Sequence, residues 1–266
     1  MTKVHNKPYF LNPRQFDPDH PLFVFLPGMD ESTSLALMQV ASVEAAFDVC
    51  SFVIQPDVMD SWDDLCEQVA ALTTAALKTV PRKSVYLCGE SFGGCLALKV
   101  MVNAPELFDR IVLVNPASSF NRRPWIHWGS LLTRWLPEWL YQMTSALFLP
   151  FLASGKRMTP AAHQTLLESV RSVPLKTSIQ RLSMMRGFNL DENQLSQYTK
   201  PVLIIASKGD QLLPSVAEAK RLARIFPNAQ VVTLPHSGHA CLLETDVNLY
   251  EIMQSQNFLD DLPFSC

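Results

Sequence analysis

Six short apolar runs, separated by segments of helical character, constrain the fold of this chain more than any other feature. Each run is rich in Val, Ile, Leu or Phe, and most lack the apolar–polar alternation of a half-exposed strand. They cover residues 22–26, 49–54, 84–88, 111–114, 202–206 and 230–234. Strands that are buried on both faces of a parallel sheet have this composition. The pattern therefore predicts an α/β protein with a mostly parallel, doubly wound sheet.

Helices are expected between these runs, over residues 34–47, 61–80, 92–103 and 215–226. Two of them open with a capping-box pattern, Ser61-x-x-Asp64 and Ser215-x-x-Glu218, whose side chains can satisfy the free amides of a first helical turn. Strand–helix alternation then stops. From residue 119 to 199 the chain has no clear strand, several prolines and four of the five tryptophans.

We therefore expect one α/β core formed by residues 1–118 and 200–266, with residues 119–199 inserted as a helical cap. A chain of 266 residues is an ordinary length for a single domain of this kind. Its formal charge is −3 and no Lys/Arg-rich stripe occurs, so nucleic acid is not an expected partner. The sequence also lacks metal-ligand motifs and phosphate-binding glycine motifs, so neither a metal nor a cofactor is expected.

Cysteine usage and hydropathy indicate the compartment. The six cysteines form no CxxC pair and no regular spacing, which favours a reducing environment. The N-terminal segment has no apolar signal core, and the most apolar run, 146–153, is too short to span a bilayer. We expect a cytoplasmic protein whose contact with membranes is peripheral.

The segment Gly89-Glu90-Ser91-Phe92-Gly93 is a G-x-S-x-G sequence between an expected strand and an expected helix. Alone it is a weak signal, because Gly and Ser are common in turns that have no chemical role. The strand–turn–helix setting is that of a nucleophile elbow, in which flanking glycines prevent clashes around a strained Ser. The sequence therefore predicts that Ser91 is a nucleophile.

An acid and a base follow two later runs, in the order that such an elbow requires. Asp210 comes just after the run ending at residue 206, and His239 just after the run ending at residue 234. The carboxyl ends of parallel strands bring such groups together. His239 would accept the proton of Ser91, and Asp210 would orient the imidazole. His236 is the alternative base, but it precedes the Gly-His step and is interpreted as a loop or supporting residue.

The run 111–114 is followed by Asn115, which is not an acid and so offers no rival carboxylate. Two backbone amides are expected to bind the oxyanion: that of Met29, in the loop after the first run, and that of Phe92, after the nucleophile. Six of the nine glycines (28, 89, 93, 94, 209 and 238) lie in these loops. Packing alone does not explain this concentration of glycine.

Trp125, Trp128, Leu132 and Trp135 are spaced three, four and three residues apart, which aligns them on one helical face. One interpretation is that this stripe packs the insertion onto the sheet. The other is a cap that offers an apolar tunnel to a substrate and contacts a lipid surface. The two are compatible, and we assign the three tryptophans to the substrate pocket.

Five segments of the chain resemble the motifs of one family, the hydrolase half of the plastid phytyl ester synthase/diacylglycerol acyltransferase group with its cyanobacterial relatives. In the family's order they are FLPGMD, LCGESFGGCLALKV, LVNPASSF, SKGDQLLPSVAEAKRL and GHACLLETDVNLYEI. The resemblance covers most of the chain beyond the first twenty residues. It implies an α/β-hydrolase fold with Ser91, Asp210 and His239 as the catalytic triad.

The chain departs from this family in two places. The plant proteins carry an acyltransferase domain with an H-x4-D motif, and no His of this chain has Asp five positions later. The family loop usually reads LPGxDG, whereas Glu31 stands where the second Gly is expected. The resemblance therefore implies first the cleavage of lipid-like acyl esters, and only weakly acyl transfer to a long-chain alcohol such as phytol. A hydrophobic acyl ester is the expected substrate, with peripheral contact to a membrane or lipid droplet.

Two other classes of function remain open from the sequence, because a fold does not fix an activity. One is a ligand-binding protein that keeps the fold without chemistry, which the complete Ser–Asp–His set argues against. The other is a C–C bond hydrolase or a cofactor-free lyase that uses the same three residues.

Overall fold

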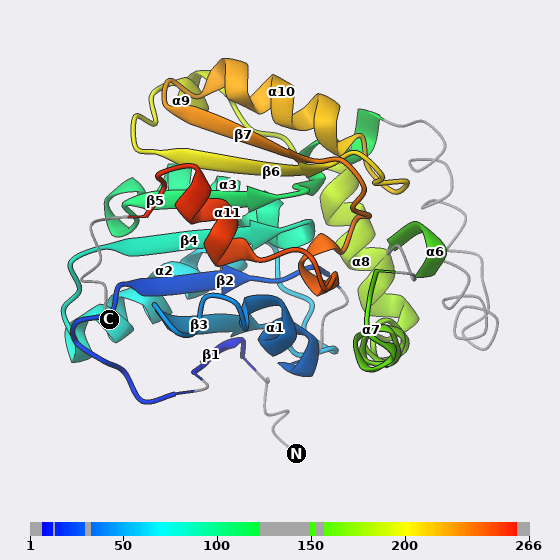
Figure 1. The fold of residues 1–266 in the computed structure, drawn as a ribbon, viewed down its shortest axis with the longest axis horizontal. Helices are drawn as coiled ribbons and strands as arrows, with labels where there is room; N and C mark the ends of the chain where they lie inside the picture. Colours follow the sequence, from blue (N-terminus) through cyan, green and yellow to red (C-terminus); the bar gives the residue numbers. More distant parts are fainter. Residues whose placement is uncertain (1–6, 13, 30–32, 123–148, 153–156, 260–266) are drawn as a thin grey trace.

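The structure, a computed structural model, describes residues 7–12, 14–29, 33–122, 149–152 and 157–259. Its centre is a seven-stranded sheet in the order β1-β3-β2-β4-β5-β6-β7 (Figure 1). The strands are β1 (Tyr9–Leu11), β2 (Leu22–Leu26), β3 (Asp48–Val53), β4 (Val85–Glu90), β5 (Arg110–Val114), β6 (Val202–Ser207) and β7 (Ala229–Leu234). All neighbouring pairs are parallel except β1 with β3. The expected mostly parallel sheet is confirmed.

The central strands have the burial that their composition predicts. Every residue of β2, β4 and β6 is buried, whereas β7, the strand at one edge of the sheet, has only exposed and partly buried positions. The short antiparallel β1 at the other edge was not expected from the sequence, because a half-exposed strand of three residues carries little apolar signal.

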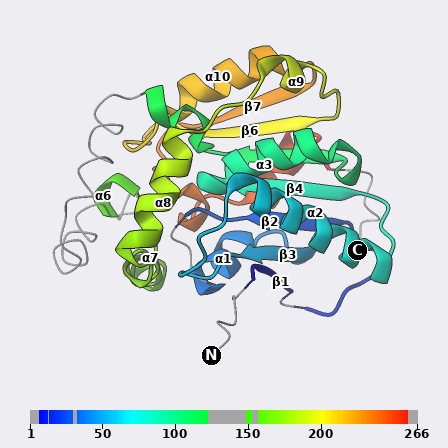
Figure 2. The same ribbon diagram turned by 180° about the vertical axis from the view of Figure 1, so that it is seen from behind.

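Helices cover both faces of the sheet (Figures 1 and 2). The helices α2 (Trp62–Thr79), α3 (Phe92–Asn103) and α10 (Ser215–Ile225) contribute to one apolar core, and α1 (Thr33–Val40) and α11 (Leu249–Ser255) to the other. Strand β2 supplies both cores: Leu22, Val24 and Leu26 lie in the first, and Phe23 and Phe25 in the second. This two-sided burial is what makes the central strands apolar at every position.

Local signals predicted some helix boundaries correctly and others not. The capping box of α2 is present, with the Ser61 hydroxyl accepting from the Asp64 amide at 3.2 Å. The predicted box at Ser215 is wrong, because α10 begins after Pro214 without a side-chain cap and the Ser215 hydroxyl points elsewhere. Helix α1 ends at Val40, earlier than expected, because the chain turns there before it enters β3.

Between β5 and β6 the described residues form helices. They are η2 (Ala117–Arg122), α6 (Leu149–Leu152), α7 (Pro160–Ser172), α8 (Leu175–Arg186) and α9 (Glu192–Ser196). Figures 1 and 2 show α6, α7 and α8 beside the end of the sheet at which the parallel strands terminate. The boundaries of the core and of the cap stay predictions. Trp125, Trp128 and Trp135 lie outside the described residues.

Two short 3-10 helices, η1 (Pro105–Leu107) and η5 (Cys241–Leu243), complete the described elements. No helix in the described part of the chain has both the length and the hydropathy needed to cross a membrane.

Candidate active site

Ser91 lies in a strained turn between β4 and α3. Its φ is 52° and its ψ is −112°, a backbone conformation that residues other than glycine rarely adopt. The turn is closely packed: a Cβ added to Gly89 would lie 2.3 Å from the Gly93 carbonyl oxygen, and one on Gly93 would lie 1.9 Å from the Leu26 carbonyl oxygen. Both glycines are therefore required by the close approach of backbone to backbone.

The structure brings the three predicted triad side chains together. His239 Nε2 lies 2.8 Å from Ser91 Oγ, and His239 Nδ1 lies 2.7 Å from Asp210 Oδ2. The three residues follow β4, β6 and β7, whose carboxyl ends all lie at the same end of the sheet. Asp210 and His239 are 8% and 4% exposed, so this pair lies largely out of water.

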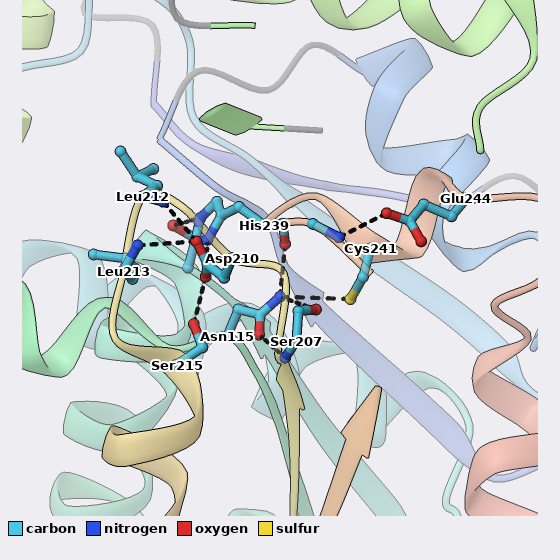
Figure 3. A network of polar contacts seen from close by, with 11 residues as sticks. Asn115, Ser207, Asp210, Leu212, Leu213, Ser215, His239, Cys241 and Glu244 are labelled. Atoms are coloured by element: carbon cyan, nitrogen blue, oxygen red, sulfur yellow. Dashed lines mark hydrogen bonds and ion pairs between the residues drawn. The ribbon is translucent and has the colours of Figure 1, made fainter. Parts of the chain in front are cut away.

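Both oxygens of the Asp210 carboxylate accept hydrogen bonds (Figure 3). Its Oδ1 accepts from the amides of Leu212 and Leu213 at 2.8 and 2.9 Å, and its Oδ2 accepts from the Ser215 hydroxyl as well as facing His239. Burial by itself would raise the pKa of Asp210, but the His239 charge and these hydrogen bonds outweigh burial and hold that pKa below its usual value. Asp210 therefore stays ionised beside the imidazole.

The two predicted oxyanion donors lie on adjacent segments. Phe92 is the first residue of α3, so its amide has no acceptor within the helix. Met29 follows β2, the neighbour of β4 in the sheet, and the Leu26 and Pro27 carbonyls of that loop lie against Gly93. The structure thus places the Met29 loop beside the first turn of α3.

Two residues that support this region were not found from the sequence. Arg181 of α8, which is 5% exposed, donates to the carbonyls of Met29 and Gln55. Trp62, at the start of α2, stacks on the Phe92 ring with centroids 4.5 Å apart and donates through Nε1 to the Met184 carbonyl at 3.1 Å. Both contacts join segments far apart in the chain, and no local pattern indicates them.

Asn115 is a third missed residue. It is fully buried at the end of β5, with a φ of 42°. Its Nδ2 donates to the His239 carbonyl at 2.7 Å and to Ser207 Oγ at 3.0 Å, and its Oδ1 accepts from the Ser207 amide at 2.8 Å (Figure 3). The side chain thus joins β5, β6 and the His239 loop. Its place at the start of the NPASSF segment is the one signal in the sequence that points to it.

Rivals of the triad are less well placed. His236 is exposed, whereas His239 is buried against Ser91 and Asp210. Burial raises the pKa of the nearby Cys241 thiol well above its usual value, which makes this thiol a poor nucleophile. Within the described residues, no cluster of His, Cys, Asp or Glu side chains could hold a metal ion.

Residues 55–246 match the protein family described as serine aminopeptidase, S33. The chain belongs to this family. It is 29% identical to the chloroplastic phytyl ester synthase 1 of Arabidopsis thaliana over 91% of its own length, which is only 39% of that relative. It is 31% identical to a pimeloyl-acyl-carrier protein methyl ester esterase of Nitrosomonas europaea, over 70% of this chain and 73% of that one.

Solved structures agree on the fold. An α/β hydrolase enzyme from a Medee basin deep-sea metagenome library superposes with a TM-score of 0.71, at 18% identity and over 97% of both chains. The expected α/β-hydrolase fold and the family resemblance are confirmed. At the level of the family the chain is an α/β hydrolase, and these two relatives are named as an ester synthase and an esterase.

Proposed function

We propose that this α/β hydrolase cleaves lipid-like acyl esters through an acyl-serine intermediate, with Ser91, His239 and Asp210 as its triad. The proposal is carried by one observation, the continuous series of hydrogen bonds from Ser91 Oγ through the imidazole to the Asp210 carboxylate. A strained turn presents the hydroxyl at one end of this series, and a buried ionised carboxylate closes the other.

In this proposal each group has a role that its geometry supports. Asp210 accepts from Nδ1–H of His239, so the lone pair of Nε2 faces the Ser91 hydroxyl. As Oγ bonds to the substrate carbonyl carbon, its proton passes to Nε2 and the carbonyl oxygen becomes an oxyanion. The amides of Met29 and Phe92 bind that oxyanion. The C–O bond to the alcohol then breaks, and His239 returns the proton to the leaving oxygen.

In the second half of the reaction an incoming hydroxyl group attacks acyl-Ser91. His239 removes its proton, the bond to Oγ breaks, and the proton returns to Ser91. When the hydroxyl group belongs to water the product is a fatty acid, and when it belongs to an alcohol the product is a new ester. Hydrolysis and transfer therefore use the same residues and differ only in the acceptor.

The relatives support the substrate class. Both the plant relative and the Nitrosomonas europaea relative are named for esters: a phytyl ester, and the methyl ester of an acyl-carrier protein conjugate. We extend the proposal to acyl transfer to a long-chain alcohol such as phytol, and to peripheral contact with the membrane or lipid droplet that would hold such substrates. The tryptophans assigned to the pocket, Trp125, Trp128 and Trp135, belong to this part of the proposal.

An active-site probe tests the nucleophile. Wild-type protein should be labelled by a fluorophosphonate and should cleave a short-chain ester, whereas Ser91→Ala should lose the labelling and roughly 10^6 of the turnover. Ser255→Ala, which changes an exposed serine far along the chain, is the matched control and should behave like wild type. Labelling that persists in the Ser91 variant would contradict the assignment.

Product analysis tests acyl transfer. Water is present at roughly 55 M, so a millimolar alcohol competes only if it is preferred by about 10^4 to 10^5, or about 5.5–7 kcal/mol. Burial of a long alkyl chain contributes about 0.8 kcal/mol per methylene before the costs of binding, which makes such a preference attainable. An acyl donor incubated with phytol, dodecanol or ethanol at equal concentration should give ester in amounts that fall as the acceptor becomes shorter. Free fatty acid alone in all three would restrict the function to hydrolysis.

A further inference from the structure

Another buried carboxylate, that of Glu244, lies just beyond the proposed triad, in the GHACLLE segment. The side chain of Glu244 has no exposed surface. Its Oε1 accepts a hydrogen bond from the Gly238 amide at 2.8 Å, and its Oε2 accepts one from Nε of Arg157 at 2.8 Å. Figure 3 shows Glu244 on the far side of the His239 loop from Asp210. None of the proposed chemical steps uses this carboxylate.

The partner of Glu244 comes from the insertion between β5 and β6. The Ala240 amide donates to the Leu152 carbonyl at 2.7 Å, and the Thr245 amide donates to the Arg157 carbonyl at 2.9 Å. Met158 and Glu244 form an isolated antiparallel bridge. The insertion is thus joined by backbone hydrogen bonds to the segment that follows the proposed general base.

These contacts hold the backbone on both sides of His239. On one side, the Gly238 amide is bound by Glu244. On the other, the His239 carbonyl is bound by Asn115. A histidine ring that must lie 2.8 Å from one partner and 2.7 Å from another depends on its backbone being held in this way. Misplacement of a reacting group by about 1 Å is enough to cost about 100-fold in rate.

We propose that Glu244 is a positioning residue for His239, and that Arg157 couples the placement of the insertion to the alignment of the triad. The inference rests on the proposed role of His239 as the base. Arg157 supplies the positive charge that a fully buried carboxylate requires, so loss of this contact leaves Glu244 with an uncompensated charge next to Gly238. Loss of the Arg157 contact therefore disturbs the proposed base.

Paired variants separate positioning from plain stabilisation. Glu244→Leu removes the acceptor of the Gly238 amide, and its kcat on a short ester should fall by about 10- to 100-fold with KM within about twofold. Glu244→Gln keeps an oxygen for Gly238, so its kcat should stay within about threefold of wild type. The labelling rate with a fluorophosphonate should follow kcat in both variants, because labelling also requires an aligned Ser91 and His239.

The coupling to the insertion is tested with Arg157→Met. Alone, this change should lower kcat about tenfold, because it leaves a buried charge unpaired, and adding Glu244→Gln should restore most of the loss. Asp246→Asn is the matched control: Asp246 also contacts Arg157 but is more than half exposed and does not reach Gly238. Its kcat should stay within about twofold. This cycle also decides the matter if Glu244→Leu does not fold.

Two results would overturn the inference. One is a set of variants with lower Tm whose folded fraction keeps wild-type kcat and labelling rate, because the pair would then only stabilise the fold. The other is Arg157→Met activity that Glu244→Gln does not restore. A wild-type protein that is neither labelled nor active would instead refute the proposed function itself, so the two failures are distinguishable.

Discussion

The replacement of Asn115 tests whether the amide behind the His239 loop holds the candidate site together. Asn115→Ala removes the acceptor of the Ser207 amide and the donor to the His239 carbonyl, both within fully buried surroundings. A buried amide left without a partner costs about 1–3 kcal/mol, and each further lost bond about 0.5–1.5 kcal/mol. The expected loss of unfolding free energy is therefore about 2–4 kcal/mol.

The backbone adds a separate contribution. At a φ of 42°, a Cβ costs roughly 1–2 kcal/mol, a cost that asparagine and alanine both carry and that glycine relieves. Asn115→Gly therefore separates the lost amide bonds from the strain. Asn115→Asp keeps an acceptor for Ser207 but sets a carboxylate oxygen against the His239 carbonyl. It should fold and yet lose much of its turnover.

Thermal unfolding and ester cleavage measure these effects. A loss of about 3 kcal/mol corresponds to a fall in Tm of roughly 6–12 °C for a chain of this size. The alanine variant should show this fall in full and the glycine variant a smaller one, because glycine relieves the strain, and kcat should be lower in both. A glycine variant as stable and active as wild type would refute the reasoning, because Asn115 would then supply only its backbone conformation.

Three further outcomes are expected. His239→Ala should abolish ester cleavage, whereas His236→Ala should lower it only slightly. An inactive His236 variant would show that the general base has been assigned to the wrong histidine. Asp210→Asn should lower turnover by about 10^4, because the amide permits the wrong imidazole tautomer. The folded-state pKa of Asp210 lies below the ordinary value of an aspartate. The stability that the ionised carboxylate contributes is therefore present above that ordinary value and is lost as the pH falls through the folded-state value. Acid unfolding of the Asp210→Asn variant should lack this component. Trp128→Ala and Trp135→Ala should impair cleavage of long-chain esters more than of acetate or butyrate esters, since each lost side chain removes about 1.5–3 kcal/mol of burial that only a long chain reaches. Equal losses at every chain length would support a packing role instead.

The sequence by itself determined the layered α/β architecture and the order of the three proposed triad residues. The reason is that these features are local. A strand buried on both faces must be apolar at each position, as β2 is, and a tight elbow must have glycines on either side of Ser91. Because β6 and β7 are parallel, the residues that follow these two strands lie at the same end of the sheet. Asp210 and His239 could therefore be chosen from their positions alone.

Only the tertiary structure decided which side chains support that site. Ser215 fits the local rule for a helix cap, yet Pro214 holds the cap position, and the Ser215 hydroxyl donates to the buried carboxylate of Asp210. Arg181 and Glu244 are charged residues in ordinary helical and loop sequence, and their burial depends on partners 152 and 87 residues away in the chain. Periodicity and capping patterns report the neighbours of a residue along the chain. The partners of a buried polar group are set by the packing of distant segments, which is why these contacts could not be read from the sequence.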